Sequence, residues 1–114
     1  MQWRIIAHLR NDEDVMTRHK MRPVSPGEVL REQLEELGMS ANGLAAALHV
    51  PTNRITGILN ETRALTPETA LRLERYFTGT TAQFWLNLQT NFALRRAEIA
   101  SAKAVREIVP RKAS

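Results

Sequence analysis

Helical periodicity is the feature of this sequence that most restricts its fold. Between residues 25 and 97, apolar side chains recur every three or four positions in successive segments. That spacing places them on one face of an α-helix, whereas a half-buried strand would alternate apolar and polar residues. No such alternation occurs in this stretch. We therefore predict an all-α fold with five helices between residues 25 and 97.

Residues that favour helix ends separate the five helices. Ser25 precedes Pro26 and, three positions after the serine, Glu28, which is the pattern of a capping box. Ser40 and Thr66 are predicted to be the cap residues of the second and fourth helices. The side chains predicted to face the core are Val29, Leu30, Gln33, Leu34 and Leu37, then Leu44, Ala45 and Leu48, then Ile55, Ile58 and Leu59, then Ala70, Leu73 and Phe77.

The second and third helices have the spacing of a helix-turn-helix motif. Ala45 is small, and apolar residues follow it at +5, +10 and +13, where two helices joined by a tight turn must pack together. A larger side chain at position 45 would push the helices apart. His49 occupies the turn position that usually holds glycine, and histidine is one of the residues that tolerate a left-handed conformation. The segment from Leu44 to Asn60 is therefore predicted to be a helix-turn-helix.

The outer face of the third helix carries short polar side chains. Asparagine can bind the N6 and N7 atoms of adenine, threonine can contact base edges or a thymine methyl, and glycine permits close approach. The predicted base-reading residues are Thr52, Asn53, Thr56 and Gly57, and the predicted phosphate contacts are Ser40, Arg54, Asn60 and Arg63. The alternative is an ordinary solvated face. A glycine costs about 1 kcal/mol inside a helix, and this cost favours a functional reason for Gly57.

The composition argues against an enzyme or a metal protein. The chain has no cysteine, its three histidines are not clustered, and it has neither a glycine-rich phosphate loop nor a Ser/His/acid set. We therefore expect no catalytic residues, metal or cofactor. No apolar run reaches the length of a membrane span, and the N-terminus lacks the order of a secretory signal. These features predict a cytoplasmic protein that has no contact with membranes.

The length and the charge distribution suggest how the domain is organised. A chain of 114 residues that is 43% hydrophobic can build one modest core. We predict an N-terminal extension over residues 1–24, a helix-turn-helix DNA-binding domain over 25–97 and a basic C-terminal tail over 98–114. A weak helical pattern continues through Ile99 and Val105 until Pro110. The basic tail suits phosphate contact as well as simple solvation.

Four segments carry a resemblance to a known family. They are Ser25-Pro26-Gly27-Glu28-Val29-Leu30, the Leu44–Asn60 helix-turn-helix, Leu65-Thr66-Pro67-Glu68-Thr69-Ala70-Leu71-Arg72-Leu73, and Phe84-Trp85-Leu86-Asn87-Leu88-Gln89. Together they resemble the HigA-type antitoxins, which belong to the lambda-repressor-like fold. The resemblance implies a homodimer that represses its own operon by binding operator DNA and that neutralises a HigB-type mRNA-cutting ribonuclease toxin. The alternative is a stand-alone helix-turn-helix repressor without a toxin partner.

The fifth helix is the candidate dimer contact. A single recognition helix reads few base pairs, so a second copy is needed for selective binding. We expect Phe92 and Leu94 to form this interface and Trp85 and Leu88 to lie in the core. The alternative is that all four side chains lie in the core. The first helix also carries four acidic residues, Glu28, Glu32, Glu35 and Glu36. They could contact a basic toxin surface, but we favour an ordinary solvated face, in which Arg31 can pair with Glu35.

Overall fold

The computed structural model describes residues 24–112, and every regular element in that part of the chain is an α-helix. The helices are α3 (Pro26–Leu37), α4 (Ala41–Leu48), α5 (Thr52–Leu59), α6 (Pro67–Tyr76) and α7 (Ala82–Arg106). The predicted all-α fold with five helices is thus confirmed. The segment 3–9, which suits a strand or a helical turn, and the acidic run at 12–14 lie outside the described residues.

The predicted caps are present in the structure. The hydroxyl of Ser25 accepts a hydrogen bond from the backbone N–H of Glu28 at 3.1 Å, and that of Ser40 accepts one from Gly43 at 2.9 Å. The hydroxyl of Thr66 likewise accepts from the backbone of Thr69. Each bond satisfies an N–H group that a helix start leaves without a partner in the helix. The starts of α3, α4 and α6 are therefore set by local sequence.

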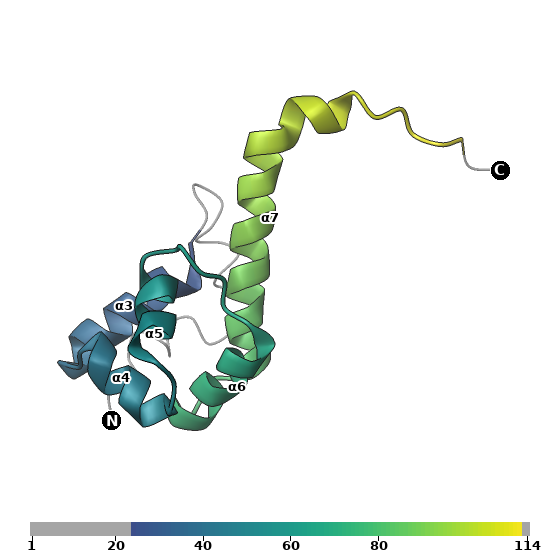
Figure 1. The fold of residues 1–114 in the computed structure, drawn as a ribbon. Coiled ribbons are helices and arrows are strands. Elements are labelled where there is room, and N and C mark those ends of the chain that lie inside the picture. Colours follow the sequence, from purple (N-terminus) through teal and green to yellow (C-terminus); the bar gives the residue numbers. More distant parts are fainter. Residues whose placement is uncertain (1–23, 113–114) are drawn as a thin grey trace.

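One hydrophobic core lies between the helices, and the first half of α7 closes it (Figure 1). Phe77 and Trp85 are its largest fully buried side chains, with ring centroids 6.2 Å apart. The indole N–H of Trp85 donates to the hydroxyl of Thr80 at 3.1 Å, and that hydroxyl donates to the carbonyl of Phe77 at 2.8 Å. The indole N–H, the hydroxyl and the carbonyl in this series of hydrogen bonds therefore all have partners, as buried polar groups need.

Helices α3 and α5 meet at Gly27. A Cβ atom at this position would lie 2.1 Å from the carbonyl oxygen of Ile58 and 3.1 Å from the Cα of Leu59. Only glycine therefore allows the start of α3 to touch the backbone at the end of α5. This contact sets how closely α3 approaches α5.

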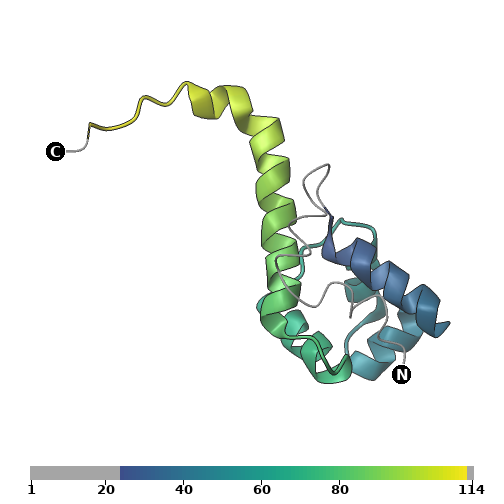
Figure 2. The same ribbon diagram turned by 180° about the vertical axis from the view of Figure 1, so that it is seen from behind.

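Helix α7 extends well beyond the core (Figures 1 and 2). It runs for 25 residues to Arg106, so the predicted domain boundary at residue 97 falls inside the helix, and residues 98–106 of the predicted tail are helical. Alanine, glutamate, lysine and arginine are good helix formers, so they continue the helix without a packed partner. None of the described helices combines the length and the apolarity needed to cross a membrane.

Candidate nucleic-acid interface

Helices α4 and α5 are joined by the predicted tight turn. His49 has φ 62° and ψ 44°, which is the left-handed conformation, and its N–H donates to the carbonyl of Ala46 at 3.2 Å. The N–H of Val50 donates to the carbonyl of Ala45 at 3.0 Å. Ala45 and Ile55 are buried. The prediction that histidine replaces glycine at a left-handed turn position is confirmed, and α4, the turn and α5 form a helix-turn-helix.

The predicted base-reading residues share one outer face of α5. Asn53 is exposed, whereas Thr52, Thr56 and Gly57 are half-buried. Two hydroxyls on this face already have partners in the protein: that of Thr52 donates to Oδ1 of Asn42 on α4, and that of Thr56 contacts the carbonyl of Asn53 at 3.4 Å. The first bond links the face of α5 to α4. Asn42 of α4 therefore lies next to Thr52, at the edge of this face.

Gly57 has a structural role that the sequence did not indicate. A Cβ atom here would lie 2.9 Å from the Cβ and 3.3 Å from the Cδ of Arg63. The carbonyl of Gly57 also accepts the N–H groups of Thr62 and Arg63, at 2.9 and 3.2 Å. The missing side chain lets the loop after α5 fold back onto the helix. Part of the reason for glycine at this position is therefore intramolecular.

The predicted phosphate contacts have different surroundings. Arg63 is exposed on the loop after α5, and Ser40 is exposed at the start of α4 while its hydroxyl caps that helix. Oδ1 of Asn60 accepts a hydrogen bond from Nη2 of Arg31 at 3.4 Å, and the same Nη2 donates to the carbonyl of Leu59 at 3.2 Å. Arg31 thus binds the end of α5, a contact that differs from the predicted pairing with Glu35.

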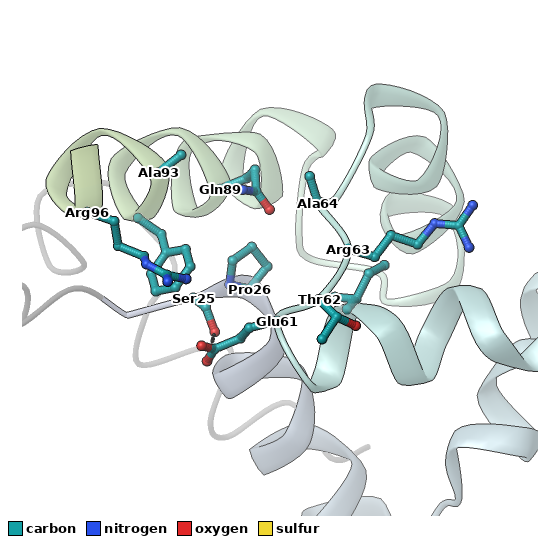
Figure 3. Close-up of a pocket in the computed structure, with 11 residues that line it drawn as sticks. Ser25, Pro26, Glu61, Thr62, Arg63, Ala64, Gln89, Ala93 and Arg96 are labelled. Carbon is teal, nitrogen blue, oxygen red and sulfur yellow. Dashed lines mark hydrogen bonds between the residues drawn. The ribbon is translucent and has the colours of Figure 1, made fainter. Parts of the chain in front are cut away.

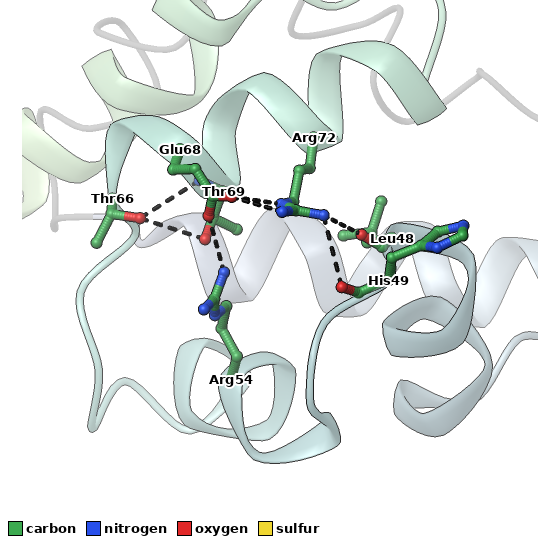
Figure 4. A network of polar contacts seen from close by, with 7 residues as sticks. All are labelled: Leu48, His49, Arg54, Thr66, Glu68, Thr69 and Arg72. Atoms are coloured by element: carbon green, nitrogen blue, oxygen red, sulfur yellow. Dashed lines mark hydrogen bonds and ion pairs between the residues drawn. The ribbon is translucent and has the colours of Figure 1, made fainter.

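Arg54, the remaining phosphate candidate, belongs to a network of charged side chains (Figure 4). Its Nη1 lies 2.9 Å from Oε1 of Glu68, and Nη2 of Arg72 lies 2.6 Å from Oε2 of the same carboxylate. Nη1 of Arg72 donates to the carbonyl of Leu48 at 2.8 Å, at the end of α4. The hydrogen bond from Arg72 is the largest cause of a lowered pKa for Glu68, and Arg54 acts in the same direction.

Neither Glu68 nor Arg72 is predicted from the sequence to belong to the site. The spacing of four residues between them is a recognisable signal for an ion pair on one helix. Arg54 is fourteen residues from Glu68 along the chain, and Arg72 is 24 residues from Leu48, so these two contacts depend on the fold. We call Arg54, Glu68 and Arg72 the charged triad.

A hollow of about 320 Å³ lies between the start of α3, the loop after α5 and α7 (Figure 3). Ser25 at its edge donates to Oε2 of Glu61 at 2.8 Å, and Glu61 has a left-handed backbone with φ 63°. Gln89 of α7 accepts the N–H of Leu65 at 2.9 Å. These bonds hold both ends of the loop that carries Arg63.

The two predicted dimer residues lie on different sides of α7. Phe92 lines the hollow, and the guanidinium carbon of Arg96 is 5.3 Å from the centre of its ring. Leu94 is 57% exposed, whereas Trp85 and Leu88 are fully buried. Residues two positions apart on a helix do not face the same way. The alternative in which all four are core residues is therefore wrong for Leu94.

Comparisons with known proteins agree with this geometry. The helix-turn-helix family model matches residues 30–84. An addiction module antidote protein of the HigA family from Coxiella burnetii is 50% identical, with a TM-score of 0.74, over 80% of this chain and 100% of that one. The antitoxin HigA of Pseudomonas aeruginosa, solved with the higBA promoter, is 44% identical, with a TM-score of 0.73, over 78% and 98%. Virulence-associated protein I of Dichelobacter nodosus is 47% identical over 82% of this chain and 85% of its own length.

Proposed function

Because the chain belongs to the HigA family of helix-turn-helix antitoxins, we propose that it represses its own operon by binding operator DNA and neutralises a HigB-type ribonuclease toxin. The observation that carries this proposal is the outer face of α5, the second helix of the helix-turn-helix, which presents short polar side chains. The protein acts as a binding protein in the cytoplasm, where its DNA is found, and it has no catalytic role.

Base contacts are assigned to the outer face of α5. A major groove admits an α-helix, and base edges there present different donors and acceptors for each base pair. Asn53 is exposed near the start of α5, where the side chains of a recognition helix reach base edges. Thr52, Thr56 and Gly57 complete the same face.

Phosphate contacts position the helix and supply the salt-dependent part of the affinity. Arg63 follows α5 on a loop that hydrogen bonds to Ser25, Gly57 and Gln89 hold in place. Ser40 is exposed at the start of α4. Asn60 lies at the end of α5 and Arg54 on its flank. We assign phosphate contacts to these four side chains.

Two copies of the chain are needed to read an operator selectively. Recognition helices in successive major-groove faces must be about 34 Å apart, so a rigid contact must set their separation. Helix α7 is the longest element described, and it carries apolar side chains on its exposed length, among them Leu94. We therefore propose a homodimer with α7 at its contact, in which Leu94 meets the partner on one side of the helix and Phe92 meets it on another, beside the hollow.

Alanine substitutions test the DNA assignment. Asn53→Ala and Thr56→Ala should each weaken binding to the operator by about 1–3 kcal/mol and leave binding to random duplex nearly unchanged. Arg63→Ala should weaken both and flatten the dependence of affinity on salt. Fluorescence anisotropy on both duplexes measures these effects. Equal losses for all three variants on both duplexes would overturn the base-reading assignment.

The toxin partner is tested separately. The product of the neighbouring gene should be a short basic ribonuclease whose growth arrest is relieved when this protein is co-expressed. Operator binding without such a neighbour would favour the stand-alone repressor.

A further inference from the structure

The ion pair between Arg54 and Glu68 restrains a side chain that is assigned to DNA phosphate. Nη1 of Arg54 lies 2.9 Å from Oε1 of Glu68, so the guanidinium already has an anionic partner in the free protein. A phosphate must compete with this carboxylate for the same donor. We propose that Glu68 is a specificity-determining residue: it holds Arg54 away from phosphates until α5 is seated in its operator. This inference rests on the proposed operator binding.

The exposure of the triad permits such an exchange. The side chain of Glu68 is 56% exposed and that of Arg54 is 28% exposed. Water can therefore solvate the carboxylate oxygen that Arg54 leaves, so release does not create an unpaired buried charge. The second oxygen keeps its partner, because Nη2 and Nε of Arg72 lie 2.6 and 2.8 Å from Oε2.

Arg72 also keeps Glu68 in place. Its Nη1 donates to the carbonyl of Leu48 at 2.8 Å and lies 3.5 Å from that of His49, at the end of α4. Arg72 therefore bridges α6 and the turn of the helix-turn-helix (Figure 4). Glu68 stays at a fixed place beside α5 while Arg54 changes partner.

This competition acts differently on the two kinds of DNA. On an operator, base contacts fix the register of the helix, so one phosphate stays in reach of Arg54. On random DNA no base contact holds the helix, and Arg54 remains with Glu68. The carboxylate thus lowers the affinity for random DNA more than the affinity for the operator.

Glu68→Gln tests this proposal because it removes the charge and keeps the shape. Dissociation constants are measured for the operator and for a random duplex of equal length over a range of salt concentrations. We expect the affinity for random duplex to rise about two- to fivefold, the range that an exposed ion pair is worth. For random duplex, the slope of the logarithm of the binding constant against the logarithm of the salt concentration should become steeper by up to about 0.9 for each arginine that is released to bind a phosphate. The operator affinity should change less, so the specificity ratio falls.

Two controls separate this effect from a change in net charge. Glu74→Gln removes one carboxylate from the same helix outside the charged triad, and it should have a smaller effect. In an Arg54→Ala background, Glu68→Gln should change the affinity for random duplex no more than Glu74→Gln does. Glu68→Ala repeats the test without an amide oxygen that could still hold Arg54, and circular dichroism checks that each variant is folded.

Two results would overturn the role of Glu68. One is an equal effect of Glu68→Gln and Glu74→Gln on random duplex, and the other is an effect that persists without Arg54. A wild-type protein with no preference for the operator would refute the proposed function instead. The comparison on random duplex would still decide whether Glu68 restrains Arg54.

Discussion

Replacing Gly27 with alanine should destabilise the domain, although alanine is the better helix former. The new Cβ would lie 2.1 Å from the carbonyl oxygen of Ile58 and 3.1 Å from the Cα of Leu59. Both neighbours are backbone atoms, so no side-chain rotation relieves the overlap. Helices α3 and α5 must instead move apart by about 1 Å, which loosens the packing between them.

The size of the effect follows from two opposing contributions. Overpacking of a core typically costs about 1–3 kcal/mol, and a backbone contact belongs at the upper end of that range. The gain in helix propensity from glycine to alanine is at most about 1 kcal/mol. We therefore expect a net loss of about 2 kcal/mol in the free energy of unfolding. For a domain of this size, such a loss lowers the melting temperature by about 10 °C.

Gly43→Ala is the matched control, since it also places alanine in a short helix. Its Cβ would meet only the side chains of Ser40 and Met39, at 3.3 and 3.5 Å. We expect this variant to be at least as stable as the wild type. Urea unfolding followed by circular dichroism measures both variants. If Gly27→Ala matched Gly43→Ala in stability, the close contact between α3 and α5 would not determine the packing of the domain.

Two further predictions concern the core and the dimer. Thr80→Val leaves the buried indole N–H of Trp85 without its acceptor and should cost about 1–3 kcal/mol in thermal unfolding, whereas Thr78→Val at an exposed site should be nearly neutral. Replacing Phe92 and Leu94 together with polar residues should give a folded monomer with weaker operator binding, and Leu94→Asp alone tests the exposed side of α7 without disturbing the hollow. A dimer in sedimentation experiments on both variants would place the interface elsewhere.

The helices and the helix-turn-helix were predictable because their causes are local. Cap residues act on N–H groups two or three positions away, and apolar spacing fixes which face of a helix is buried. The left-handed turn at His49 follows from the same short-range rules, and the small side chain of Ala45 indicates where two helices approach closely. The outer face of α5 could be identified because it is the side that the buried residues leave exposed.

The ion-pair partners of the charged residues and the contacts of the glycines were not predictable, because they depend on residues distant in sequence. Arg54 is a phosphate candidate by its position on α5, but only the packing of α6 against the helix-turn-helix gives it Glu68 as a partner. Gly57 suggests close approach to DNA, whereas the fold of the following loop brings Arg63 against it.

The sequence by itself therefore determined which segments are helices, which faces are buried and which face of α5 is left exposed, since each depends on neighbours within one or two turns. The tertiary structure decided how closely α3 approaches α5, which charges are already paired, and how far α7 extends beyond the core. Those properties depend on the distances between elements, and only the packing of the whole domain sets such distances.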